Sequence, residues 1–185
     1  MTTPIVDTLI NHPPTHSVVI GNIEGIEQAL HLLTLLDDAQ YCYVATPYTQ
    51  SSIGAHLRHI NDMYFALMSH SDTQGLVDYD QRRRGDLVET DRQVAIDELR
   101  TIQTWLHQLT QDDLQTLVTI QSETSLYQQQ VCQMPSTMQR ELLFVASHTT
   151  HHFSVMRVNA EACQVKTERI FSYAPATASY LRSQA

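Results

Sequence analysis

The chain has 185 residues and a formal net charge of −9, with 11 Lys and Arg residues against 20 Asp and Glu residues. This balance provides no basic surface for nucleic-acid phosphates, so we expect no nucleic-acid partner. The length is typical of a single domain, residues 1–185, because a chain of this size can bury a substantial hydrophobic core.

The cysteines and the apolar segments indicate the compartment. Cys42, Cys132 and Cys163 are odd in number, widely spaced and without a CxxC motif, which is typical of reduced thiols rather than of a disulfide framework. The first residues lack the positive charge and the long apolar run of a signal peptide. No segment approaches the about 18 uninterrupted apolar residues of a membrane span. We therefore expect a cytoplasmic protein without a membrane partner.

Four stretches of the chain carry apolar residues at the three- and four-residue spacing of an amphipathic helix. The first follows Asn22, a candidate N-cap, and is expected to end before Pro47. The second covers about residues 51–69, where Ser51 or Ser52 can cap the helix. The small number of glycines, five in all, also favours long helices over a sheet of many strands.

The second half of the chain contains a change of period. A polar connection over residues 70–91 leads to the third helix, which we expect Asp91 to cap. Residues 117–132 then alternate polar and apolar side chains around a polar SETS segment, which predicts a short hairpin or extended arm. Pro135 is expected to begin the fourth helix, which continues to about Ala160.

These elements predict an all-α fold, a four-helix bundle with a short extended or hairpin segment between the third and fourth helices. The core of the bundle is expected over about residues 20–162. The tail, residues 163–185, is expected to be irregular, with Phe171, Tyr173 and Pro175 packing over the bundle or over an opening in it.

The fourth helix contains a cluster of histidines, in residues 147–157, SHTTHHFSVMR. His148 and His152 are four residues apart, so a helix places them on one face with about 5–6 Å between their Cβ atoms. Apolar neighbours such as Phe144 and Val145 direct this face toward the core. Burying polar groups without partners costs about 1–3 kcal/mol each, which favours two neutral rings that share a metal ion. Two core histidines bonded to backbone carbonyls or water are the alternative.

The second helix offers candidates for a third ligand in the segment SIGAHLRHIND. His56 and His59 are three residues apart, and both lie at the edge of the apolar stripe. Bundle interiors commonly build metal sites from facing helices, and three histidine ligands leave positions open for water or substrate. The spacing alone does not distinguish His56 from His59.

Two motifs of this sequence resemble the DinB-like superfamily, which includes metal-dependent enzymes. In SSIGAHLRHINDMY the ligand histidine of the family falls on His59, and in ELLFVASHTTHHFSVM its HxxxH pair falls on His148 and His152. The family usually has Gly and Gln two and three residues after the second histidine, where this chain has Ser154 and Val155. The tail and the arginine-rich segment are similar to those of an uncharacterised branch.

The resemblance implies a bundle that holds one divalent metal ion, zinc or nickel, through His59, His148 and His152. Better-known relatives transfer low-molecular-weight thiols, isomerise maleylpyruvate with a thiol cofactor, or take part in thiohistidine biosynthesis. The resemblance therefore implies a metal-dependent enzyme that acts on a small-molecule substrate. The implied reaction is of the thiol S-transferase or hydrolase type, with a low-molecular-weight thiol as a candidate cosubstrate. A non-catalytic metal-binding or sensing bundle, a bundle whose histidines bind nothing, and a homodimer also stay open.

Residues next to the proposed ligands have competing interpretations. His56 and His151 could orient a ligand or act as a general base, or they could be packed or solvated rings, and the two alternatives are balanced. Arg82, Arg83 and Arg84 could clamp a carboxylate, but a solvated loop held by its own salt bridges is favoured.

Other chemically active residues are expected outside the metal site. Glu141 lies about 10 Å along the helix from His148, too far for it to share the ion easily. Cys42, between two tyrosines, is predicted to be a core residue. The remaining histidines are expected at the surface or at helix caps: His12, His16, His31, His70 and His107.

Overall fold

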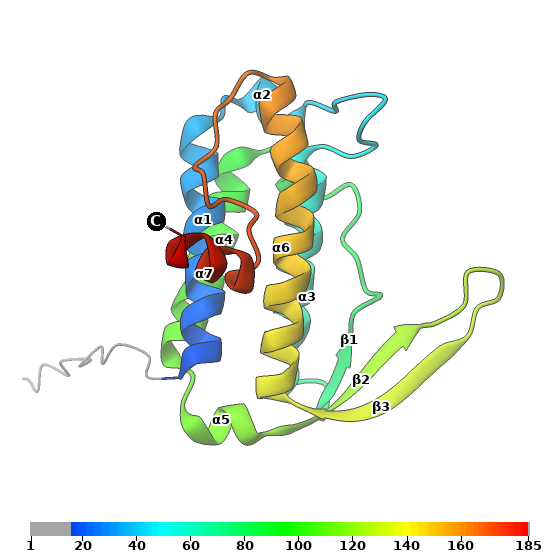
Figure 1. Cartoon of the computed structure of the whole chain (residues 1–185). Helices are drawn as coiled ribbons and strands as arrows, with labels where there is room; N and C mark the ends of the chain where they lie inside the picture. Colours follow the sequence, from blue (N-terminus) through cyan, green and yellow to red (C-terminus); the bar gives the residue numbers. More distant parts are fainter. Residues whose placement is uncertain (1–15, 185) are drawn as a thin grey trace, which may run out of the picture.

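Four long helices form the body of the molecule (Figure 1). The structure is a computed structural model that describes residues 16–184, and His12 lies outside these residues. The four helices are α1 (Ser17–Leu35), α3 (Ile53–Met68), α4 (Arg92–Gln108) and α6 (Met138–Ala162). α1 and α3 each pack against both α4 and α6. These four helices correspond to the four segments with a helical period in the sequence.

The apolar stripes of the four helices meet in one hydrophobic core. Ile26 of α1, Leu57 of α3, Leu99 of α4 and Leu142 of α6 are completely buried there. Full burial of such a side chain contributes about 1.5–3 kcal/mol relative to exposure, so the stripes hold the helices together. None of the helices within residues 16–184 is long and apolar enough to span a membrane.

The N-caps of α3 and α4 are the predicted ones. The Ser52 hydroxyl accepts a hydrogen bond of 3.1 Å from the backbone N–H of Ala55, and the Asp91 carboxylate accepts bonds from the first turn of α4. Each bond satisfies a backbone donor that a helix start leaves without an intrahelical partner. Local chemistry therefore fixes the beginning of both helices.

The predicted start of the first helix is wrong. α1 begins at Ser17, and His16 is its N-cap. Asn22 lies inside the helix and is completely buried, where its amide donates to the carbonyl of Leu142 (3.1 Å) and accepts from the hydroxyl of Tyr64 (2.7 Å). Long-range partners therefore use the side chain that would otherwise cap a helix. The helix ends at Leu35, before Pro47, as expected.

Shorter helices connect these elements. They are α2 (Asp38–Cys42), α5 (Gln111–Gln115), α7 (Pro175–Ser183) and the 3-10 helix η1 (Leu87–Glu89). Cys42, predicted to be a core residue, is exposed at the end of α2 because the preceding Tyr41 points into the core instead. The hydroxyl of Tyr41 donates to the carbonyl of Val88, which ties η1 to the bundle.

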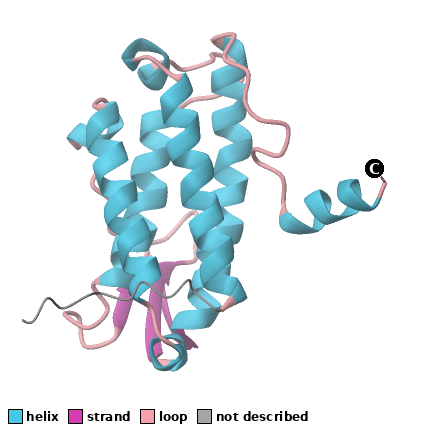
Figure 2. Cartoon of the chain, turned by 90° about the vertical axis from the view of Figure 1, so that its left-hand side faces the viewer, coloured by secondary structure: helices cyan, strands magenta, loops and turns pink. Residues whose placement is uncertain are grey.

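A three-stranded sheet lies at one end of the helices (Figures 1 and 2), so the fold is mostly helical but not all-α. Its strands are β1 (Leu76–Asp78), β2 (Leu117–Glu123) and β3 (Val131–Thr137). β2 and β3 form the predicted hairpin, with Ile120 opposite Met134. β1 was not expected. It pairs with β2 in parallel, with Val77 opposite Ile120, and gives the supposed polar connection a buried anchor.

The sequence suggested that Pro135 begins the fourth helix, but Pro135 lies in β3. β3 is an edge strand, where the missing N–H of proline costs the sheet little. α6 begins at Met138, and the hydroxyl of Thr137 caps it by accepting from the backbone N–H of Arg140.

The tail after α6 contains α7 and is therefore not wholly irregular. Phe171 is buried and stacks on Phe153 of α6, with 4.9 Å between the ring centroids. Tyr173 and Pro175 line a cavity of about 730 Å³ between α1 and α6. Both predicted positions of the tail, over the bundle and over an opening, are thus present. α7 itself has no buried residue and projects from the side of the bundle (Figure 2).

Candidate metal centre

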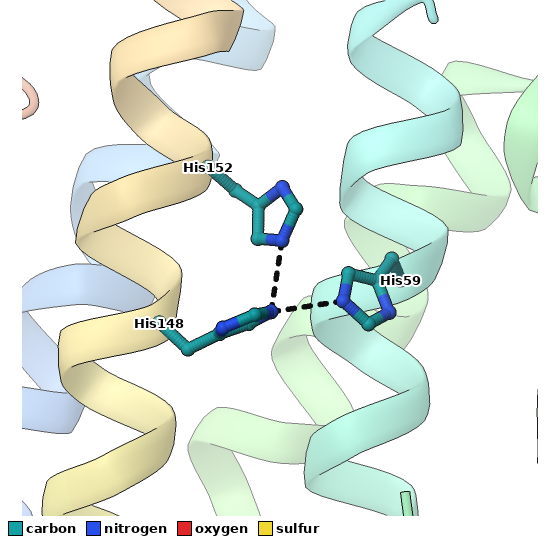
Figure 3. A group of neighbouring side chains, drawn as sticks. All are labelled: His59, His148 and His152. Carbon is teal, nitrogen blue, oxygen red and sulfur yellow. Dashed lines mark hydrogen bonds between the residues drawn. The ribbon is translucent and has the colours of Figure 1, made fainter. Parts of the chain in front are cut away.

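Three histidine rings meet between α3 and α6 (Figure 3). Nε2 of His148 lies 2.9 Å from Nε2 of His59 and 2.8 Å from Nε2 of His152. Candidate ligand atoms of all three residues lie within 4.8 Å of one another, so this group could hold a metal ion. The structure therefore brings together the three residues that the family motifs identified.

The packing of α3 against α6 produces this arrangement. His148 and His152 lie one turn apart on one face of α6. His59 approaches them from α3, a helix that is buried along most of its length. His59 is 7% exposed, whereas His148 and His152 are half-buried. The rings thus lie at the boundary between the core and the surface, where a small molecule could reach them.

Hydrogen bonds alone do not satisfy this cluster. A ring nitrogen of neutral histidine carries either one proton or one lone pair, so Nε2 of His148 cannot make a linear hydrogen bond to both neighbours. Two nitrogens on one tetrahedral zinc ion would lie about 3.3 Å apart. A small outward movement of the rings would therefore let three lone pairs share one ion. The donor set fits a divalent metal.

The outer nitrogens determine which form each ring takes. Nδ1 of His152 lies 3.0 Å from Nδ1 of His56, and this contact requires a proton on one of the two atoms. If His152 carries it and donates to His56, Nε2 of His152 keeps its lone pair for an ion. Nδ1 of His59 is buried and has no hydrogen-bond partner among the described residues. No hydrogen bond at Nδ1 therefore determines which nitrogen of this ring carries the proton, and Nε2 is free to carry the lone pair.

Burial keeps the rings uncharged. It lowers the pKa of His59 to about 3, with the Arg82 guanidinium as the next cause, and it lowers the pKa of His152 to about 3, with the His148 ring next. The pKa of His148 and that of His56 are also lowered, again mainly by burial. Neutral imidazole is the form that binds metals. At neutral pH the cluster is therefore ready to act as a ligand set.

A cavity of about 250 Å³ adjoins two of the rings, His59 and His148. The side chains of α3 and α6 form one wall, and β2 with the segment after β1 forms the other. Its lining combines apolar and polar groups: Met63, Tyr79, Asp80, Arg82, Ile120, Ser122, Arg140, Glu141 and Phe144. The triad is thus accessible from one side.

A comparison with known protein families agrees with the resemblance found in the sequence. A model of the DinB superfamily matches residues 24–156, more than half of the chain and a region that contains all three histidines. The chain belongs to the DinB superfamily. No curated protein and no solved structure gave a significant match.

Within the DinB region, the structure separates His56 from His151. His56 contacts His152 through Nδ1, so it lies behind a member of the triad. His151 is exposed, and its ring centroid is 5.3 Å from that of His152 without a hydrogen bond. Ser154, which replaces the usual DinB glycine, is exposed and donates to the carbonyl of Thr150. Neither of these exposed residues holds the triad in place.

The other histidines that the structure describes, His16, His31, His70 and His107, do not belong to the triad. His16 caps α1, and the ring of His31 lies 3.4 Å from the carboxylate of Glu168 at the surface.

Glu141 is also separate from the triad. It is completely buried and accepts hydrogen bonds from Tyr79, Ser136 and Arg140.

The three arginines after β1 have different surroundings. Arg83 pairs with Asp62 of α3 (2.6 Å) and with Glu98 of α4 (2.6 and 3.0 Å). Salt bridges therefore do hold this segment, but the acids come from the bundle and not from the segment itself. Arg82 and Arg84 are both exposed, but only Arg82 lines the cavity beside the triad. No local pattern in the sequence indicates the two distant acids that bind Arg83.

Proposed function

We propose that this protein binds one divalent metal ion through His59, His148 and His152, and that it is a metal-dependent enzyme for a small molecule. One observation carries the proposal: three Nε2 atoms of neutral imidazoles converge, and two of the rings, those of His59 and His148, line a cavity. A purely structural site is typically closed by four protein ligands, whereas catalytic sites commonly have three. The convergence on an open side therefore favours chemistry over bracing.

The donor set favours zinc or nickel, since imidazole nitrogen suits both ions and no thiolate or carboxylate belongs to the described group. A bound ion of this kind would supply Lewis-acid chemistry, because it lowers the pKa of a coordinated thiol or water. The ring of His56 orients His152 through the contact between their Nδ1 atoms. Phe144, Met63 and Ile120 give part of the cavity an apolar lining.

We propose a reaction of the thiol S-transferase or hydrolase type, with a low-molecular-weight thiol as the cosubstrate in the first case. The superfamily match and the open side of the triad support this class. The chain itself has no cysteine in the cavity lining, so a nucleophilic sulfur would have to come with the substrate. A non-catalytic metal-binding or sensing role is the competing function.

Turnover by metal-loaded protein tests the enzymatic proposal. Thiol conjugation to an aryl halide and hydrolysis of an aryl ester can both be followed by absorbance, with zinc or nickel supplied in turn. We expect a metal-dependent rate in at least one assay and its loss in His148→Ala. Metal binding without any rate above that of His148→Ala would favour the sensing role instead.

A further inference from the structure

The charged side chains around the cavity are not all neutralised. Four of them line it: Asp80, Arg82, Arg140 and Glu141. Arg140 pairs with Glu141 at 2.7 Å, which cancels one positive and one negative charge. Asp80 accepts hydrogen bonds from the Ser122 hydroxyl and from a backbone N–H of β2. The guanidinium of Arg82 makes no hydrogen bond or ion pair with any side chain described in residues 16–184.

Charges of both signs surround Arg82. Burial lowers its pKa, with Arg58 and Arg84 as the next causes, while Asp80 and Asp62 raise it. Arg82 in turn lowers the pKa of both His59 and His148. Among the charged side chains that line the cavity with His59 and His148, Arg82 is the one without a hydrogen bond or ion pair to a described side chain. An anion that enters the cavity would pair with this guanidinium and lie beside two of the three histidines.

The backbone at Arg82 is held by its neighbour, although Arg82 itself is exposed. The backbone N–H of Arg83 donates to the carboxylate of Asp62 at 3.1 Å, and its guanidinium binds Asp62 and Glu98. Asp62 follows His59 by three residues on α3, so the same helix anchors the triad and the Arg82 segment. A ligand that bound Arg82 would not have to order a mobile loop first, and its affinity would benefit from this preorganisation.

We propose that Arg82 binds the carboxylate of the small molecule that enters this cavity, so that the site selects small carboxylates. A guanidinium presents parallel N–H donors that match the two oxygens of a carboxylate. The volume of about 250 Å³ limits the ligand to a molecule smaller than a typical drug. The inference rests on the proposed function, because it assumes that the ligand reacts at the triad.

Two thiols that differ only in charge provide the test, 3-mercaptopropionate and 3-mercaptopropionamide. We would titrate each into full-length protein loaded with cobalt, whose thiolate complexes absorb in the near ultraviolet. We expect the carboxylate to bind at least about tenfold more tightly than the amide, which is the effect of a hydrogen bond to a charged group. Arg82→Gln should bring the two affinities together without changing that of the amide.

Two further variants control this comparison. Arg84→Gln removes an exposed charge from the same segment, outside the cavity lining, and should behave as the unmodified protein. Arg82→Lys keeps the charge without the fork and should recover part of the preference. A preference for the carboxylate that survives Arg82→Gln unchanged would overturn the inference, since it would come from the metal alone.

A metal-free measurement separates this inference from the proposed function. If neither thiol gives the absorption band, thiol binding at the metal fails, and propionate then tests Arg82 by itself. We expect the Nε–H resonance of Arg82, assigned by its loss in Arg82→Gln, to shift with propionate and not with propionamide. An unchanged resonance would overturn carboxylate binding at Arg82 whatever happens at the metal.

Discussion

The Nδ1 atoms of His56 and His152 lie 3.0 Å apart, while Nε2 of His152 faces the triad. His56 therefore contacts a proposed ligand through its outer nitrogen and does not itself point a nitrogen at the centre of the group. This geometry distinguishes His56 from His59, which the spacing in the sequence left equivalent as candidate ligands.

The first prediction concerns the order in which substitutions of these histidines weaken metal binding. His59→Ala should weaken metal binding far more than His56→Ala, which should cost about 10–100-fold because it removes only a group that orients His152. Dissociation constants can be measured by competition with a chromogenic chelator near pH 7.5. His151→Ala, which changes an exposed ring, is the matched control and should have little effect. A larger loss in His56→Ala than in His59→Ala would reverse our assignment.

The second prediction is a loss of stability of the metal-free protein in acid. Folding lowers the pKa of His59 and of His152 from 6.5 to about 3, so between these pH values the unfolded chain binds protons that the folded chain does not. The free energy of unfolding should therefore fall as the pH drops from about 6.5 toward 3.

Urea denaturation in the presence of a chelator, at several pH values over this range, measures the effect. The double variant His59→Gln, His152→Gln lacks both rings and should lose less stability over the same interval. Carboxylates contribute equally to both proteins, so the difference between them isolates the histidines. Parallel stability curves for the two proteins would show that these rings do not cause the acid sensitivity.

The third prediction concerns the close approach of α3 and η1. A Cβ atom at Gly54 would lie 2.1 Å from the carbonyl oxygen of Glu89 and 2.7 Å from a ring carbon of Tyr41. Gly54→Ala should therefore lower the free energy of unfolding by about 1–3 kcal/mol, as overpacking does. Thermal or urea denaturation provides the value.

Gly21→Ala is the matched control, because a Cβ atom at Gly21, inside α1, meets nothing within 4 Å. It should raise stability by up to about 1 kcal/mol, since alanine favours the helix over glycine. If both variants were equally stable, α3 and η1 would not be packed as tightly as we describe.

Features that depend on neighbours in sequence could be predicted. Ser52 and Asp91 cap their helices with atoms only two or three residues away. The pairing of His148 with His152 follows from the helical repeat alone. The assignment of His59 needed the resemblance to a family as well, because the period also allowed its neighbour one turn before.

Features that depend on distant partners could not be predicted. Asn22 is a good capping residue by type, but the carbonyl of Leu142, far along the chain, binds its side chain in the core. β1 has only three residues, and its partner β2 lies about forty residues later, so its alternation was too short to recognise. Arg83 is held by Asp62 and Glu98 from two different helices, and no local pattern reports such a network.

The fourth prediction is the metal content of the protein itself. Elemental analysis of protein purified without a histidine tag should find about one divalent ion per chain, because three imidazoles at one point retain zinc or nickel tightly. The variant His148→Ala, His152→Ala should be nearly free of metal yet remain helical, since the bundle has its own hydrophobic core. A double variant that retained one ion per chain, or unmodified protein that held none after exposure to zinc and nickel, would contradict the metal centre.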